Sequence, residues 1–215
     1  GSFIRREIEV LKASILITRD KDGTLRAFHN VCPHRGTRLV EEDHGRKARF
    51  TCPYHAWTFG NDGALITAPD FEKFYVAKAD CCLTPVAVDS CGGMIFVNID
   101  RRPERPSLRG YLGEELAAQI DDTIFARVTH FHEYCYEIGA NWKLTFDNFQ
   151  ENYHLRFIHP KSGAAAAGKD NPFGYPVDYG FHGAHRTQTI WSNPEPKIVP
   201  TQGLAFGRAM QFARG

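Results

Sequence analysis

The chain has little charge imbalance and no long apolar run, and each absence removes a class of function. Its 215 residues carry 26 Lys and Arg against 25 Asp and Glu, and no block of one sign stands out. Nothing therefore indicates a nucleic-acid partner or binding to an anionic membrane surface. Apolar runs such as residues 94–97 are far too short to cross a bilayer. Residues 1–6 also lack the apolar core of a signal peptide.

The placement of the six cysteines argues against a disulfide framework. Two of the six cysteines lie at metal-ligand spacing, and Cys81 and Cys82 are adjacent, which makes a bridge between them awkward. Without an export signal, the pattern favours a cytoplasmic protein with four spare thiols. The six positions are Cys32, Cys52, Cys81, Cys82, Cys91 and Cys135.

The first hundred residues read as short strands joined by tight turns. Residues 15–19 and 24–28 flank a Lys-Asp-Gly turn, and residues 56–59 and 64–67 flank an Asn-Asp-Gly turn. Asp-Gly between apolar strands is a strong hairpin signal. With a further strand at residues 93–99, the pattern predicts a small antiparallel β domain.

A linker and two helices are predicted next. Residues 101–107 are charged and interrupted by proline, as in a linker. Apolar residues then recur every four positions from Leu108 to Ile124, which predicts one amphipathic helix. A second helix is expected over about residues 142–158. The fold class is therefore α+β, with domains at residues 1–107 and 108–215.

Two short arms of cysteine and histidine give the strongest chemical signal. Cys32 and His34 form C-x-H, and after seventeen intervening residues Cys52 and His55 form C-x₂-H. Thiolates suit an iron that stays ferric, whereas neutral imidazoles suit an iron that accepts the electron. Replacing two thiolates by imidazoles raises the potential of a [2Fe–2S] cluster from about −400 mV to roughly −150 to +300 mV. The alternative is a structural zinc site, but zinc modules usually pair like ligands within each arm.

These residues resemble the Rieske motif of ring-hydroxylating oxygenases, the Rieske non-haem iron oxygenases. The likeness covers the runs at residues 28–36 and 52–57 and resumes at residues 141–160. It implies a Rieske [2Fe–2S] cluster on Cys32, His34, Cys52 and His55. It also implies a catalytic α+β domain of helix-grip type, and His55 facing the catalytic iron of a neighbouring subunit.

The later run carries a candidate second metal site. His154 and His159 are five residues apart, or about 140° around a regular helix, so they share a metal only if the helix bulges or ends between them. Pro160 disfavours helix at His159. Two imidazoles and a carboxylate form the facial triad of non-haem Fe(II) oxygenases. Alone, the H-x₄-H spacing is weak, but the resemblance implies that both histidines bind mononuclear Fe(II).

The resemblance also assigns a role to Glu151 and exposes a departure. The family places an acid, usually Asp, three residues before the first histidine, where it bridges to the Rieske histidine across the subunit interface. Some members that act on quaternary ammonium compounds carry Glu there. The third iron ligand of the family lies far beyond the second histidine, and Asp170, Asp178 and Glu195 come too early. We therefore expect the chain to be incomplete.

Four other histidines are interpreted as ordinary polar residues. His130 and His132 alternate along the chain, and His182 and His185 lie three apart, without a carboxylate or cysteine in register.

Together these features predict the terminal oxygenase of a multicomponent system, a mono- or dioxygenase. Such a protein hydroxylates an aromatic substrate or oxidatively demethylates a small molecule, using O₂ and electrons that come from NAD(P)H through a separate reductase or ferredoxin. The resemblance further implies a homotrimer, with or without a β subunit. The alternative is a Rieske ferredoxin, which would leave the segment with His154 and His159 without a purpose.

Overall fold

The computed structural model of the chain describes residues 1–123, 127–129, 136–159 and 176–190. It divides into two compact units, Gly1–Tyr111 with Gln119–Ala126, and Leu112–Ala118 with Arg127–Gly215. Among the described residues, no helix is both long and apolar enough to cross a bilayer.

A six-stranded antiparallel sheet forms the body of the first unit, in the order β4-β1-β2-β3-β8-β9. The predicted hairpin at residues 15–28 is confirmed, because β2 and β3 pair with Ile15 opposite His29 and Arg19 opposite Leu25. The strands are β1 (Ser2–Ile8), β2 (Ala13–Arg19), β3 (Leu25–His29), β4 (His44–Arg46), β8 (Pro85–Cys91) and β9 (Met94–Asn98).

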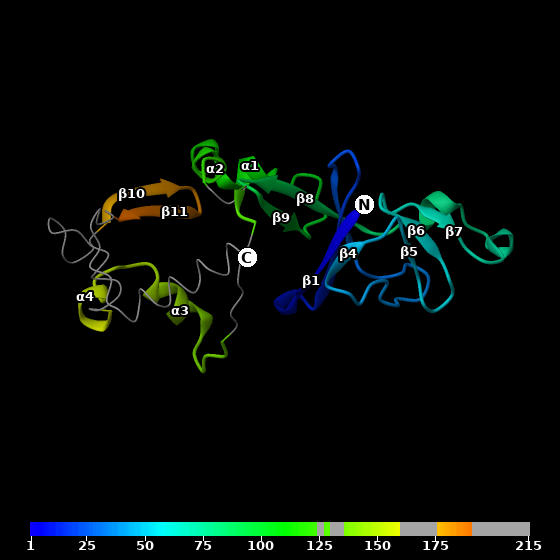
Figure 1. Cartoon of the computed structure of the whole chain (residues 1–215), viewed down its shortest axis with the longest axis horizontal. Coiled ribbons are helices and arrows are strands. Elements are labelled where there is room, and N and C mark those ends of the chain that lie inside the picture. Colours follow the sequence, from blue (N-terminus) through cyan, green and yellow to red (C-terminus); the bar gives the residue numbers. More distant parts are fainter. Residues whose placement is uncertain (124–126, 130–135, 160–175, 191–215) are drawn as a thin grey trace. The chain divides into compact units, whose positions relative to one another are not determined.

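A second, three-stranded antiparallel sheet contains β5 (Arg49–Thr51), β6 (Thr58–Gly60) and β7 (Leu65–Thr67). The predicted hairpin at residues 56–67 is therefore confirmed as β6 and β7. This sheet lies at the end of the unit away from the β8–β9 hairpin (Figure 1). Short 3₁₀ turns follow β1 and β7, at Glu9–Leu11, Phe71–Lys73 and Lys78–Cys81.

Strand β2 is buried on both faces. Because side chains alternate along a strand, its neighbouring residues enter two different cores. Leu16 packs into a core that also holds Phe28, Phe50 and Phe59. Ile15 packs with other aliphatic side chains in a separate cluster. Full burial of each such side chain contributes about 1.5–3 kcal/mol. The first core includes Cys32, Cys52 and Trp57, so both cysteine arms are anchored in it.

The helix predicted from Leu108 to Ile124 is wrong as one element. The structure has α1 (Leu108–Leu112) and α2 (Glu114–Asp121), separated by Gly113 with φ of +79°. A left-handed residue cannot continue a right-handed helix. The apolar stripe is partly confirmed, since Leu112 and Leu116 are buried, whereas Ile124 lies outside the described residues.

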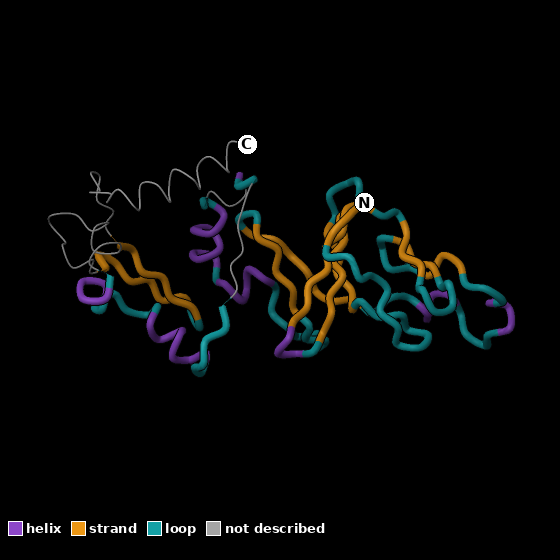
Figure 2. Tube along the Cα trace, turned by 60° about the horizontal axis from the view of Figure 1, so that its bottom comes forward, coloured by secondary structure: helices purple, strands orange, loops and turns teal. Residues whose placement is uncertain are grey.

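In the second unit, the helix predicted over residues 142–158 is also wrong as one element. It consists of α3 (Trp142–Asn148) and α4 (Leu155–Ile158). The side chain of Asn141 accepts a hydrogen bond from the Lys143 N–H at 3.0 Å and so caps α3, which explains the local role of the Asn-Trp-Lys run. Strands β10 (Pro176–His182) and β11 (His185–Ile190) form a two-stranded antiparallel ribbon (Figure 2).

Candidate metal centres

The two cysteine arms fold into loops with the same backbone hydrogen bonds. In the first, the Cys32 N–H donates to Thr37 O at 2.8 Å, and the Gly36 N–H donates to Cys32 O at 2.9 Å. In the second, the Cys52 N–H donates to Trp57 O at 2.8 Å, and Ala56 N–H donates to Cys52 O at 3.0 Å. The arms are therefore structural equivalents, although the histidine is the third residue of one loop and the fourth of the other.

Both loops turn through a left-handed residue at the same position. Gly36 has φ of +73° and Ala56 has φ of +58°. Glycine adopts this conformation without cost, whereas a residue with a Cβ is strained in it. The second loop therefore contains backbone strain that the first avoids.

A buried asparagine anchors the first loop. Asn30 is fully buried; its Nδ2 donates to Val40 O at 2.7 Å and its Oδ1 accepts from the Val40 N–H at 3.0 Å. These two bonds tie the residue that precedes the loop to the residue that follows it. The second loop is held differently, because it connects the paired strands β5 and β6.

Both thiols are buried and lie together. Cys32 and Cys52 are 1% and 2% exposed, and the two side chains interact directly. Burial raises the pKa of the Cys32 thiol, while hydrogen bonds from the backbone N–H groups of His34 and Arg35 act in the opposite direction. Such N–H groups stabilise charge on sulfur, which is how a protein tunes an iron–sulfur cluster.

The two imidazoles meet beside the thiols. The ring centroids of His34 and His55 are 4.5 Å apart, with an angle of 67° between the ring planes. Desolvation lowers the pKa of His34, and the nearby His55 and Arg35 lower it further, so its imidazole is favoured in the neutral form. Its Nδ1 atom is buried and has no hydrogen-bond partner in the described part of the chain.

This donor set fits a Rieske [2Fe–2S] cluster. Two thiols, two imidazoles and an unpaired buried nitrogen match the ligands that such a cluster requires. Within the described residues, no group of three or more His, Cys, Asp or Glu side chains is placed to hold a single ion.

The second candidate centre lies where the predicted helix breaks. The carboxylate of Glu151 accepts from the His154 N–H at 3.2 Å and also hydrogen-bonds His154 Nδ1, immediately before α4 begins at Leu155. Helix α4 then ends at His159, and the two imidazole rings lie 5.6 Å apart between centroids. The helix end thus brings together the two histidines that a continuous helix would have separated.

Contrary to expectation, Glu151 does not project from a helix. Its contact with His154 explains why its carboxyl group is charged. The hydrogen bond from His154 is the main cause that lowers the pKa of this carboxyl group below its usual value. A carboxylate on Nδ1 fixes the tautomer and leaves Nε2 of the ring free for a metal.

Strand β11 contributes residues that the sequence patterns do not single out. Arg186 donates to Gln150 O, and Gln188 Nε2 lies 3.4 Å from Oδ1 of the buried Asn152. The first contact holds the backbone before Glu151, and the second holds the side chain of the residue after it. Their separation in sequence, 36 residues, leaves no local signal that could have revealed them.

The remaining candidates divide by where they lie. Asp170, Glu195, His130 and His132 are outside the described residues, and Asp178 is exposed on β10. His182 is buried, 3.5 Å from Glu115 Oε2 and 3.3 Å from Thr187 Oγ1. These are the contacts of a polar side chain inside a fold, in line with its predicted role.

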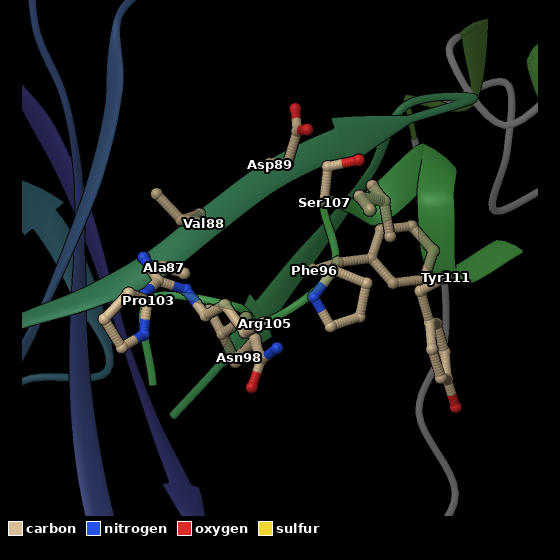
Figure 3. A pocket seen from close by; sticks show the side chains of 12 residues that line it. Ala87, Val88, Asp89, Phe96, Asn98, Pro103, Arg105, Ser107 and Tyr111 are labelled. Atoms are coloured by element: carbon tan, nitrogen blue, oxygen red, sulfur yellow. The ribbon is translucent and has the colours of Figure 1, made fainter. Parts of the chain in front are cut away.

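A cavity of about 640 Å³ lies between the β8–β9 hairpin and residues 103–111 of the first unit (Figure 3). Its charged lining residues, Asp89 and Arg105, do not point toward each other (Figure 3). No cysteine or histidine lines it. The cavity therefore has no direct part in metal chemistry.

Comparison with known families matches the two parts of the chain separately. Residues 4–86 match the Rieske [2Fe-2S] domain, and residues 125–207 match the catalytic domain of the ring hydroxylating alpha subunit. The carnitine monooxygenase oxygenase subunit of Acinetobacter baumannii is 36% identical over 88% of this chain and 48% of its own length. The glycine betaine monooxygenase oxygenase subunit of Chromohalobacter salexigens is 38% identical over 68% of this chain and 32% of its own length.

Solved structures agree. The quaternary ammonium Rieske monooxygenase CntA, in complex with an inhibitor, matches with a TM-score of 0.76 and 29% identity, over 90% of this chain and 51% of that chain. Naphthalene 1,2-dioxygenase from Rhodococcus sp. matches with a TM-score of 0.68 and 26% identity, over 90% of this chain and 46% of that chain. The chain thus spans at most about half the length of these relatives.

Proposed function

Because the chain belongs to the Rieske non-haem iron oxygenases, we propose that it acts in the terminal oxygenase of a multicomponent system. The observation that carries this proposal is the presence of two donor sets in one chain. One is the pair of equivalent Cys/His loops, and the other is the pair of adjacent imidazoles at His154 and His159. A Rieske ferredoxin would need only the first set.

We assign the ligands residue by residue. Cys32, His34, Cys52 and His55 hold the [2Fe–2S] cluster, and His154 and His159 hold mononuclear Fe(II). When bound, the cluster supplies single electrons and the iron supplies O₂ activation. We keep residues 1–107 and 108–215 as the proposed limits of the two domains.

The chain's own residues prepare each centre. The fully buried Asn30 and the hydrogen bonds of the loops hold the thiols in place, and N–H groups aimed at Cys32 offset the negative charge on its sulfur. Glu151 keeps the proton of His154 on Nδ1, which presents Nε2 as a ligand. In the proposed assembly, the same carboxylate also accepts a hydrogen bond from His55 of a neighbouring subunit.

For the substrate, we propose a quaternary ammonium compound oxidised at a C–H bond. The named relatives act on carnitine and glycine betaine, and Glu151 is the acid found in some family members of that kind. An aromatic substrate is the second candidate, because a terephthalate 1,2-dioxygenase subunit is 31% identical over 67% of this chain.

The proposed assembly is a head-to-tail homotrimer, with or without a β subunit, that takes electrons from a reductase or ferredoxin. A head-to-tail interface that closes into a ring places the cluster of each subunit beside the iron of the next. The proposed location is the cytoplasm, where reduced thiols such as those of Cys81 and Cys82 persist.

Metal analysis and turnover test the proposal together. Purified protein should contain three irons and two acid-labile sulfides per chain. With reductase and NAD(P)H, carnitine or glycine betaine should stimulate O₂ consumption more than terephthalate or naphthalene does. Two irons per chain and no turnover would support a plain carrier, and a preference for the aromatic compounds would reverse the substrate proposal.

A further inference from the structure

The two equivalent loops differ at one position that has a large structural effect. The residue whose carbonyl accepts the cysteine N–H is Thr37 in the first loop and Trp57 in the second. The backbone role is the same in both, so the side chain carries the difference. Thr37 is half-buried, whereas the indole of Trp57 is 4% exposed and belongs to the core of the unit.

The indole of Trp57 lies flat against His34, the histidine of the other loop. The ring centroids are 4.7 Å apart and the planes differ by 4°. Phe71 and Phe74 meet the indole edge-on, with centroids 5.9 Å and 5.6 Å away, and Phe74 also meets His34 edge-on at 5.9 Å. His34 therefore contacts two aromatic side chains beyond the cysteine arms' histidines, Trp57 from the second loop and Phe74, and Phe71 packs behind them against both.

His55 has a different environment. Its aromatic neighbour is Tyr54, at 3.9 Å between centroids, and Tyr54 is itself 63% exposed. His55 is exposed as well. The two histidines therefore lie in different environments although their loops are equivalent. The difference arises because only the second loop carries a tryptophan.

We propose that Trp57 is a positioning residue that fixes the imidazole plane of His34 and keeps water from that side of the cluster, leaving His55 as the solvent-facing imidazole. The inference rests on the proposed assignment of the four ligands.

Flat stacking restrains the ring, because rotation of the imidazole would drive its edge into a buried indole that cannot move aside. The unpaired Nδ1 of His34 then keeps one direction, which is what a metal ligand needs. Edge-on contacts with Phe71 and Phe74 restrain the indole in turn.

Two effects of the indole act on the reduction potential in the same direction. The reduced cluster carries one more negative charge than the oxidised one. The face of an aromatic ring is electron-rich and disfavours that added charge, and exclusion of water removes its solvation. Loss of the indole is therefore expected to raise the potential.

Three variants separate positioning from general packing. Trp57→Leu removes the ring, Trp57→Phe retains a smaller ring, and Phe59→Leu alters a fully buried side chain of the same core. Each is assayed for iron and sulfide content, for the ¹⁴N couplings of the reduced cluster by pulsed EPR, and for the reduction potential by dye titration.

Trp57→Leu should show a higher potential and a wider spread of the coupling from one of the two nitrogens. Trp57→Phe should lie between Trp57→Leu and the wild type, and Phe59→Leu should keep the wild-type potential and couplings. Wild-type values in a loaded Trp57→Leu protein, or an equal shift in Phe59→Leu, would overturn the inference.

A second measurement decides the question even if Trp57→Leu fails to load. Protein grown with 5-fluorotryptophan keeps the packing but has a less electron-rich indole face, so its potential should rise. The same growth with Trp57→Phe controls for Trp142 and Trp191 and should produce no shift. An unshifted potential in the fluorinated wild type would overturn the inference, whereas a wild-type protein without a [2Fe–2S] cluster would overturn the proposed function itself.

Discussion

Replacement of Ala56 by glycine should stabilise the protein, although it removes a methyl group beside a proposed ligand. Ala56 has φ of +58°, a conformation that costs a residue with a Cβ about 1–2 kcal/mol. Glycine relieves that cost but brings about 0.4–1 kcal/mol of additional unfolded-chain entropy. Ala56 is exposed, so the lost methyl group buries little surface. The expected net gain is about 0.5–1 kcal/mol.

The equivalent loop provides the matched control. Gly36 has φ of +73°, and a Cβ built there would meet no atom within 4 Å, so Gly36→Ala introduces backbone strain without a clash. It should destabilise the protein by about as much as Ala56→Gly stabilises it. Both variants keep the backbone hydrogen bond to the cysteine carbonyl, because the N–H is unchanged.

Urea unfolding of the iron-loaded chain measures both effects, followed by visible absorption and by tryptophan fluorescence. With a slope of about 1–3 kcal/mol per M, the midpoint should rise by roughly 0.2–1 M in Ala56→Gly and fall by a similar amount in Gly36→Ala. A lower or unchanged midpoint in Ala56→Gly would refute the argument that the second loop stores strain at this residue.

Three further substitutions test the proposed iron site and the packing of the first unit. His154→Ala should lose the mononuclear iron and retain the cluster; metal analysis showing three irons would place the site elsewhere. Glu151→Gln should keep both centres while turnover falls more than about tenfold, equivalent to about 1.4 kcal/mol in the barrier, and unchanged reoxidation of the reduced cluster by O₂ with substrate would make this carboxylate a bystander. The pKa of Asp121 is lowered, chiefly by the Gly92 N–H, so its stabilisation is full above the ordinary pKa of 3.8 and is lost as the pH falls through the lower folded value. Asp121→Asn should therefore be less stable than the wild type at pH 7 and nearly equal to it once the carboxyl is protonated; a difference independent of pH from 6 to 3 would contradict this assignment.

Much of the first unit can be predicted because its signals are local. An Asp-Gly pair between apolar strands specifies a hairpin within about ten residues, and the Cys/His arms specify their own loops. Strand β1 carries no comparable signal. It pairs with β4, where Ser2 lies opposite Arg46, and that contact depends on packing between distant parts of the chain.

The helices were predicted in the correct regions but with the wrong continuity, for two different physical reasons. A left-handed Gly113 ends α1, and periodicity alone does not reveal that a tolerated glycine will be a break. In the second unit, the His154 N–H donates a hydrogen bond to the Glu151 carboxylate, and α4 begins only after it, at Leu155. The prediction that the helix must bulge or end before His159 was correct in principle, because two imidazoles five residues apart cannot otherwise meet.

The residues that support the sites could not be predicted. Trp57 ends the second motif run, but its contact with His34 joins two loops and could not be predicted from that run. Gln188 and Arg186 reach the Glu151 segment from a strand that the sequence patterns do not predict. Such contacts arise from tertiary packing and produce no periodic pattern in the amino-acid sequence.

Pulsed EPR of the reduced wild-type protein, compared with Cys32→Ser and His55→Ala, tests the central claim most directly. The wild type should show a [2Fe–2S] signal with couplings from two directly bound imidazole nitrogens, and both variants should lose the cluster and its colour. A wild-type signal without nitrogen coupling, or a Cys32→Ser protein that retains the wild-type signal, would contradict the assignment of the four ligands.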